Sequence, residues 1–339
     1  MGKISDMRCA MTPILVTGGA GYIGSHMVLA LRECGRRVVV FDDLSTGRKE
    51  LVPADVLLVV GDIRDTAALK SVIAEHGCAD VLHFAGKIAV EESVRLPDLY
   101  RSVNVGGTES LLAACQAAGV KRFIFSSTAA VYGEGTNEPC SEEEATKPAN
   151  PYGENKLACE GLIRKAGHDF GLRHVILRYF NVAGADPLGR SGQCGPLSSH
   201  LIRVACETAY GLRQKMTIFG TDYPTPDGTC LRDYIHVSDL VDAHLRALEH
   251  LEKGGGDLTL NVGYGRGTSV RDVVSAVEKA WGKKLPVEEG PRRAGDSAVV
   301  IAKALRIREL LGWSPRHDSL NEIVESALKW EGKRLRLFS

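Results

Sequence analysis

The chain of 339 residues lacks several features that would each have indicated a particular class of protein. No apolar run approaches the roughly 20 residues of a membrane helix, so we expect no membrane partner. The 42 basic and 42 acidic residues balance, which leaves no electrostatic footprint for nucleic acid. The nine cysteines include no Cys-x-x-Cys pair. That argues against a disulfide framework or a metal site and predicts a cytoplasmic, reducing location.

The chain does have a regular alternation of strands and helices. Short runs of β-branched residues that end in small or polar residues are typical of buried parallel strands. Their alternation with helix patterns predicts an α/β fold with a doubly wound parallel sheet of the Rossmann type. The predicted buried strands lie at residues 13–17, 38–42, 56–60, 81–84, 123–128 and 175–181.

The pattern changes near Gly184, where Gly, Pro and Ser become frequent. A chain of this length buries about three-quarters of its unfolded surface, enough for one large domain or two. We predict a Rossmann-type domain over residues 1–181. Residues 182–339 would then form a smaller mixed α/β domain, with some chain crossing back to the first.

A glycine motif follows the first predicted strand and opens a helix. Gly18 would allow a tight bend, Gly21 would let a pyrophosphate approach the backbone, and Gly24 would let the helix pack on the strand. The free amides and positive end of that helix favour phosphates. Asp42 ends the second strand, where an acid accepts both hydroxyls of an adenosine ribose. A carboxylate there repels a 2′-phosphate, so we expect NAD rather than NADP.

Other positions near the predicted strand ends leave alternatives open. Asp62 either contacts adenine or caps the helix that begins at Thr66. Ala85 and Gly86 form a small-residue loop with room for a flat group or a diphosphate. Asn104 lies in a helix pattern over residues 97–119, and it is solvated, bonded to the backbone, or holds a loop near the cofactor.

The clearest catalytic candidates are Tyr152 and Lys156, which share a helix face because they are four residues apart. A phenol with a reference pKa of about 10 needs roughly 4 kcal/mol of help to ionise near neutrality. A nearby ammonium and an oxidised nicotinamide both act in that direction. Tyr152 could then accept a proton from a sugar hydroxyl. Thr128, at the end of the fifth strand, could hydrogen-bond the same oxygen.

Together these motifs resemble the extended short-chain dehydrogenase/reductase superfamily. The resemblance rests on residues 17–24, on Ser126-Ser127-Thr128 with Val131-Tyr132-Gly133, and on Tyr152-x-x-x-Lys156. Later segments resemble the UDP-glucose 4-epimerase family more closely, over residues from about 13 to 313. They are His83-Phe84-Ala85-Gly86, Leu177-Arg178-Tyr179-Phe180-Asn181, residues 218–225, and Asp227-Gly228-Thr229 with residues 232–237.

The resemblance implies tightly held NAD that is not consumed. Tyr152 would act as base, the sugar C4 would be oxidised, and the 4-keto sugar would turn and regain hydride on its other face. It implies a UDP-sugar substrate and these NAD contacts: Gly18, Gly21, Tyr22, Ile23, Gly24, Asp42, Asp62, Ile63, Phe84, Ala85, Gly86, Asn104, Lys156 and Tyr179. It implies substrate contacts from Thr128, Tyr152, Phe180, Asn181, His200, Phe219, Arg232, Arg293 and Asp296. For Arg232 an ion pair with Asp233 is the alternative.

The chain departs from the family at a few positions. Lys87 precedes the usual lysine position, which Ile88 fills, and His200 stands where an asparagine commonly meets the diphosphate. Val300 falls where a tyrosine or a small residue is thought to set room for an N-acetyl group. We therefore expect space for N-acetylated UDP-sugars, with a UDP-pentose as a further possibility.

Two other functions compete with an epimerase. A nucleotide-sugar dehydratase or decarboxylase of the same superfamily would usually carry Asp-Glu after Thr128, where this chain has Ala129 and Ala130. A silent NAD-binding regulatory protein would not need an intact Tyr152 and Lys156. The resemblance also implies a homodimer, formed by the helices over residues 97–119 and 151–167 as a four-helix bundle.

Overall fold

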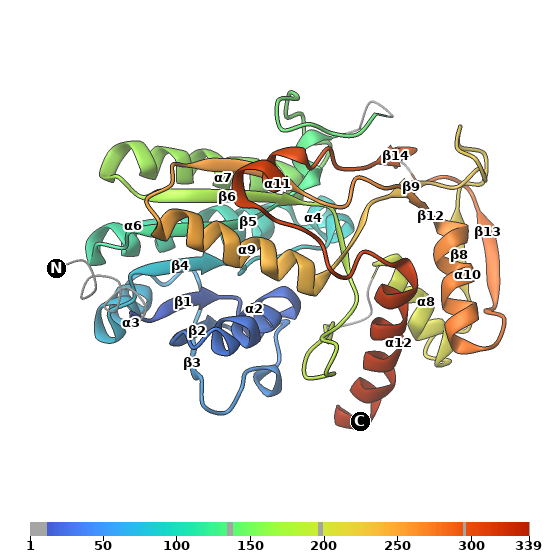
Figure 1. Cartoon of the computed structure of the whole chain (residues 1–339), viewed down its shortest axis with the longest axis horizontal. Helices are drawn as coiled ribbons and strands as arrows, with labels where there is room; N and C mark the ends of the chain where they lie inside the picture. The colour runs from blue at the N-terminus through green and yellow to red at the C-terminus, as the bar shows by residue number, and fades with distance from the viewer. Residues whose placement is uncertain (1–11, 134–137, 196–198, 294–295, 339) are drawn as a thin grey trace.

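A seven-stranded parallel sheet forms the larger part of the molecule (Figure 1). The computed structural model describes residues 12–133, 138–195, 199–293 and 296–338. The strand order is β11-β6-β5-β4-β1-β2-β3, which confirms the predicted doubly wound sheet. The strands are β1 (Ile14–Thr17), β2 (Val38–Asp42), β3 (Leu57–Val60), β4 (Asp80–His83), β5 (Arg122–Thr128), β6 (Arg173–Tyr179) and β11 (Leu258–Val262).

The central strands β1, β4 and β5 are buried along almost their whole length because both faces of the sheet are covered. Ile14 and Val16 face one cluster of buried side chains, and Leu15 between them faces another. The first cluster lies under α2 (Tyr22–Glu33) and α9 (Val237–Glu252). The second lies under α3 (Thr66–His76), α6 (Gly107–Ala118) and α7 (Pro151–Phe170).

The third strand is where the burial prediction is wrong. β3 is the edge of the sheet; its two end residues are exposed, Leu57 by 44% and Val60 by 62%, and the two residues between them are only partly covered. An apolar run in the sequence cannot distinguish a strand with two neighbours from one with a single neighbour, because both satisfy the same residue preferences.

The single helix predicted over residues 97–119 is interrupted. The chain forms α5 (Pro97–Arg101), a wider π-helical turn η2 (Ser102–Gly106) and then α6. Such turns shift the side chains that follow by about one position and often occur at functional sites. The turn contains Asn104, which is buried.

A smaller group of helices and short strands packs beside the sheet (Figure 1). Its helices α8 (Leu201–Ala209), α10 (Val270–Trp281) and α12 (Leu320–Leu337) contact one another. Its strands form three short sheets: β8 (Met216–Phe219) with β13 (Val287–Gly290); β7 (Asn181–Ala183) with β10 (Tyr234–His236); and β9 (Leu231–Arg232) between β12 (Thr268–Ser269) and β14 (Val299–Val300). The remaining elements are η1 (Lys49–Leu51), α4 (Val90–Arg95), η3 (Ala129–Tyr132) and α11 (Leu305–Leu311).

The chain returns to the large sheet after residue 182. β11 pairs with β6, and α9 packs on β5 and β6. The division at residue 181 stays a prediction. Within the described ranges, none of the helices combines the length and apolar composition that crossing a bilayer requires.

Candidate active site

The glycine turn brings two loops of the sheet into contact. Gly18 has a φ of +72°, and a Cβ there would lie 2.5 Å from the backbone nitrogen of Ala85 in the loop after β4. A Cβ at Gly24 would collide with the carbonyl oxygen of Gly18. Only at Gly21 would a Cβ meet nothing closer than 3.2 Å. Gly18 and Gly24 are therefore required by the protein itself, while Gly21 leaves its open side to a ligand.

The first turn of α2 fits a bound diphosphate. Its N-cap, Gly21, supplies no side-chain hydrogen bond, and the turn contains no acidic residue. The backbone N–H groups of this turn consequently remain available to donate hydrogen bonds, and no acidic side chain neutralises the positive end of the helix. This is the environment in which helix termini bind anionic groups.

The structure places Asp42 beside this turn. Its carboxylate accepts hydrogen bonds from the backbone N–H groups of Ala20 and Leu44, each at 2.9 Å. Only 7% of the residue is exposed, and burial raises the pKa of the carboxyl above its usual range. An acceptor fixed at the end of β2 suits ribose hydroxyls, as the sequence predicts for NAD.

Asp62 does not cap α3, so that alternative is wrong. The cap is Asp65, which accepts from the amides of Ala67 and Ala68. Asp62 instead accepts from the amide of Arg64 at 2.8 Å and pairs with its guanidinium. Its predicted contact with adenine stays a prediction.

Asn104 holds the loop after β4. Its Oδ1 accepts from the Lys87 amide at 2.8 Å, and its Nδ2 donates to the Lys87 carbonyl at 3.0 Å. The Tyr100 hydroxyl accepts from the Ala89 amide at 3.0 Å. Of the alternatives predicted for Asn104, the structure shows the one in which it fixes a loop, and the loop contains Phe84, Ala85 and Gly86.

Tyr152, Thr128 and Lys156 meet at the carboxyl end of β5. Asn150 accepts from the Gly153 amide at 2.9 Å, and with Pro151 it starts α7 so that Tyr152 lies in the first turn. Tyr152 is hydrogen-bonded to Thr128. Lys156 Nζ donates to the carbonyl of Ser126 at 2.8 Å. The three predicted catalytic residues are therefore close together and largely buried.

Burial sets the proton affinities of this cluster. It raises the pKa of Tyr152 to about 12, and the bond from Thr128 offsets only part of the rise. Burial also lowers the pKa of Lys156 to about 8. At pH 7 the Tyr152 phenol is therefore neutral, and Lys156 loses its proton more easily than a solvated lysine does.

Sequence reasoning missed a buried ion pair behind the cluster. Glu160, one turn beyond Lys156 on α7, pairs with Arg178 on β6 at 2.6 Å and accepts from Ser127 Oγ, also at 2.6 Å. Arg178 also donates to the Tyr132 hydroxyl at 3.1 Å. The signal in the sequence was a glutamate four residues after Lys156. That spacing does not identify the partner of the glutamate, because Arg178 lies on a different element.

Four of the predicted substrate residues form two pairs in the smaller part, and His200 lies apart from both. Arg293 lies over the ring of Phe219, with its guanidinium carbon 4.0 Å from the ring centroid. Arg232 lies 3.6 Å from Asp296 and donates to the carbonyl of Ser297 at 2.9 Å. His200 is exposed at the residue before α8.

The proposed ion pair between Arg232 and Asp233 does not form. Asp233 is buried and accepts from the amides of Tyr264, Gly265 and Ala302. Its carbonyl accepts from the Asn181 amide at 3.0 Å. This backbone bond consequently brings Arg232 next to the segment of Phe180 and Asn181. The Arg232 guanidinium forms no ion pair with Asp233.

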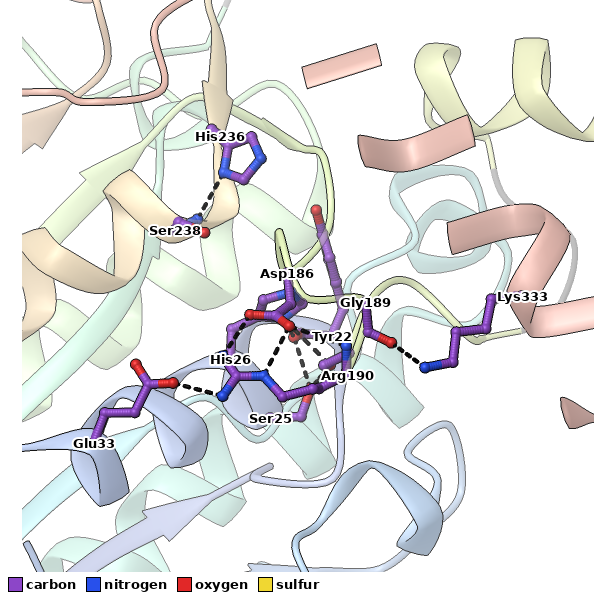
Figure 2. A network of polar contacts seen from close by, with 11 residues as sticks. Tyr22, Ser25, His26, Glu33, Asp186, Gly189, Arg190, His236, Ser238 and Lys333 are labelled. Carbon is purple, nitrogen blue, oxygen red and sulfur yellow. Dashed lines mark hydrogen bonds and ion pairs between the residues drawn. The ribbon is translucent and has the colours of Figure 1, made fainter. Parts of the chain in front are cut away.

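Helix α2 is also joined to the smaller part. Tyr22 donates to the Gly184 carbonyl at 2.6 Å. Arg190 lies between Asp186 and Glu33 of α2 (Figure 2). These contacts place the segment after β7 along the whole of α2. The two parts therefore pack against each other directly, and the residues predicted to bind cofactor and substrate lie on both of them.

The comparisons with known proteins agree with this arrangement. Residues 14–263 match the NAD dependent epimerase/dehydratase family, and the chain therefore belongs to it. UDP-glucose 4-epimerase of Azospirillum brasilense is 54% identical over 329 residues, which are 97% of this chain and 94% of that protein. This likeness places the chain among the UDP-glucose 4-epimerases, which are NAD-dependent isomerases.

Solved structures show the same relation. UDP-glucose 4-epimerase from Bifidobacterium longum, in complex with NAD⁺ and UDP, has a TM-score of 0.91 and 37% identity, and the match covers 96% of this chain and all of that one. The UDP-Glc/GlcNAc 4-epimerase of Campylobacter jejuni has a TM-score of 0.84 and 42% identity, over 95% and 99% of the two chains.

Proposed function

We propose that the protein interconverts UDP-glucose and UDP-galactose by inverting C4 of the sugar, with Tyr152, Lys156 and Thr128 as catalytic residues. The observation that carries the proposal is the hydrogen-bonded group of Tyr152 and Thr128 with buried Lys156, at the strand end next to an uncapped α2. In open α/β sheets, ligands bind beyond that end of the strands.

Tyr152 exchanges the proton of the C4 hydroxyl. At a pKa of about 12, ionisation at pH 7 costs about 7 kcal/mol. NAD, when bound, accepts and returns the C4 hydride, and its positive nicotinamide lowers that cost. Thr128 holds the sugar oxygen beside the phenol, and Lys156 supplies positive charge one turn along α7. Exchange of the proton in both directions needs only this one acid–base group.

The residues that would hold NAD come from the ends of the parallel strands, from the loops after them and from the helices α2, η2 and α7. The α2 amides and Gly21 would take the diphosphate, and Asp42 the ribose. The remaining proposed contacts are Gly18, Tyr22, Ile23, Gly24, Asp62, Ile63, Phe84, Ala85, Gly86, Asn104, Lys156 and Tyr179.

For the UDP moiety, Arg232 and Arg293 suit phosphate oxygens because a planar guanidinium binds them in pairs. Phe219, already stacked under Arg293, offers a flat face to uracil. Phe180, Asn181, His200 and Asp296 complete the proposed substrate set.

The test is turnover of UDP-glucose by purified protein without added NAD. Tyr152→Phe should lower kcat by about 10²–10⁴-fold, because general acid–base catalysis contributes that much. Tyr210→Phe is the matched control, since Tyr210 packs on Trp281 away from the site. A folded wild-type protein that retains NAD and turns over no UDP-hexose would identify the silent regulatory protein instead.

We propose that N-acetylated UDP-sugars are also substrates. Val300 pairs in register with Arg232, and its carbonyl accepts from the Asp233 amide at 3.1 Å. This supports a place for its side chain next to the substrate arginine. Val300→Tyr should lower kcat/KM for UDP-N-acetylglucosamine at least about tenfold relative to UDP-glucose. Val299→Tyr, on the opposite face of β14, is the control. No turnover of the acetylated sugar by the wild type would reject the proposal.

We propose a homodimer formed by α5, α6 and α7. Support comes from Leu96 and Leu99, which are 46% and 37% exposed beside these helices. Apolar side chains exposed together in this way mark association surfaces. Light scattering should give twice the chain mass, and Leu99→Glu should give the monomer. A monomeric wild type at micromolar concentration would exclude the dimer.

We also propose a cytoplasmic location. All eight cysteines among the described residues are free thiols, as expected in a reducing compartment. Fractionation of the source cells tests this, and recovery outside the cytoplasm would refute it.

A further inference from the structure

His244 is a buried imidazole that lies directly beneath the catalytic cluster. It comes from α9, far along the chain from β5, and none of it is exposed. Its ring centroid is 4.9 Å from that of Phe84 and 6.4 Å from that of Tyr179. Phe84 follows β4 and Tyr179 ends β6, so the imidazole touches side chains from two strand ends.

The hydrogen bonds of His244 define its tautomer. Nδ1 lies 2.8 Å from the carbonyl oxygen of Leu240, which can only accept, so Nδ1 carries the hydrogen. Burial lowers the pKa of His244 to about 4, and the ring is neutral at pH 7. Nε2 therefore accepts, and Ser126 Oγ, at 2.9 Å, donates to it.

Ser126 also holds Lys156. Its hydroxyl donates to His244 Nε2 at 2.9 Å, and its backbone carbonyl accepts from Lys156 Nζ at 2.8 Å. The imidazole and the lysine are therefore bound to the same residue, one through its side chain and the other through its main chain.

Tyr179 also stands next to a catalytic residue. It pairs in register with Thr128 across β5 and β6. Ser126 lies two residues before Thr128 on the same strand, so a shift of Ser126 would move the anchor of Lys156 close to that position. Because active sites lose rate when catalytic groups move by as little as about 1 Å, this anchor bears on the reaction.

We infer that His244 is a positioning residue: as a neutral Nδ1–H imidazole it accepts a hydrogen bond from Ser126 and so holds in place the residue whose carbonyl anchors Lys156. The inference rests on the proposed function for its kinetic consequence. Its structural content, the tautomer and the bond donated by Ser126, does not depend on which sugar is used.

The first measurement is ¹⁵N NMR of the histidine rings of the holoenzyme. The signal that Ser126→Ala shifts should show a protonated Nδ1 and an unprotonated Nε2. A protonated Nε2 at that signal, or no histidine signal that responds to Ser126→Ala, overturns the inference whatever the enzyme's activity.

The second measurement is the kinetics of UDP-glucose. His244→Phe and Ser126→Ala should each lower kcat about five- to tenfold, the effect of one hydrogen bond, with KM and NAD content unchanged. His244→Gln, whose amide oxygen can stand in for Nε2, should recover part of kcat. The double variant should lose no more than either single one.

Contrary outcomes are distinct. Unchanged kcat in His244→Phe and Ser126→Ala overturns the inference and leaves the proposed function intact. If kcat falls only in proportion to the loss of folded protein, and His244→Gln recovers none of it, the role of His244 is merely structural and the inference is overturned. His174→Gln, at a buried histidine on β6 remote from the cluster, controls for destabilisation. A wild type with the predicted tautomer but no turnover refutes only the proposed function.

Discussion

The buried carboxylate behind the catalytic helix gives a stability prediction with an internal control. Glu160 is fully buried and receives two arginines. Arg178, with a side chain 5% exposed, lies 2.6 Å away, and Arg164, 44% exposed, lies 2.8 Å away. Either arginine can be replaced by methionine, which keeps the aliphatic stem and removes the charge.

The two replacements should lower the free energy of unfolding by very different amounts. Removal of one partner of a buried ion pair costs about 3–5 kcal/mol, because the remaining charge is left without compensation. Removal of a surface partner costs about 1 kcal/mol or less. Since whole proteins have about 5–15 kcal/mol of stability, Arg178→Met should lose a large fraction of it and Arg164→Met should be close to wild type.

At lower pH the difference in stability between the two variants should be smaller. In the wild type the Arg178 guanidinium and Ser127 hold the pKa of Glu160 below its usual value against the effect of burial. The stability gained is therefore present above the unfolded pKa and is lost as pH falls through the lower folded one. Without Arg178, burial raises the pKa of Glu160, and the variant regains stability as the carboxyl takes a proton.

Urea unfolding at constant NAD concentration, at pH 7 and pH 5, measures these effects. Arg178→Met should unfold at much lower urea than Arg164→Met at pH 7, with a smaller gap at pH 5. Equal destabilisation by the two variants, or a gap that widens on acidification, would refute the role given to the buried pair.

Three other predictions follow from the site. Gly24→Ala should abolish NAD retention, measured by absorbance of the purified protein, because its Cβ collides with the Gly18 carbonyl; Gly161→Ala, in open space on α7, should retain it. Asn104→Ala should raise the Kd for NAD, measured by titration of the NAD-free protein, by about tenfold, because the loop after β4 loses two hydrogen bonds; an unchanged Kd contradicts this. Burial lowers the pKa of His83 to about 3, so between about pH 6.5 and that value the unfolded chain binds a proton that the folded chain does not. The free energy of unfolding should therefore decrease as the pH is lowered, by up to about 1.4 kcal/mol per pH unit. In urea unfolding at several pH values, His83→Gln should show a smaller decrease than the wild type, and an equal decrease would contradict the assignment.

The local pattern of residues was enough for the elements of the fold and for several side chains of the site. Glycine spacing, an acid at a strand end and the four-residue interval between Tyr152 and Lys156 are short-range features. Their geometry follows from one turn, one strand or one helix, and the structure confirms the sheet and brings Tyr152, Lys156 and Thr128 together.

Features that depend on neighbours in space could not be predicted in this way. β3 is exposed because it has one neighbouring strand. Asp233 forms no ion pair with Arg232 because its carboxylate accepts hydrogen bonds from three backbone amides. The π-helical turn at Asn104 is likewise invisible in a helix pattern, since its register is set by the loop it holds.

The sequence by itself determined the alternation of strands and helices, the cofactor class and the candidate acid–base residues Tyr152 and Lys156, because each depends on a short stretch of chain. Only the tertiary structure decided that His244 and Arg178 support that pair, and that burial makes Tyr152 a weak acid. Hydrogen-bond direction and desolvation arise from atoms contributed by distant segments, which no local pattern contains.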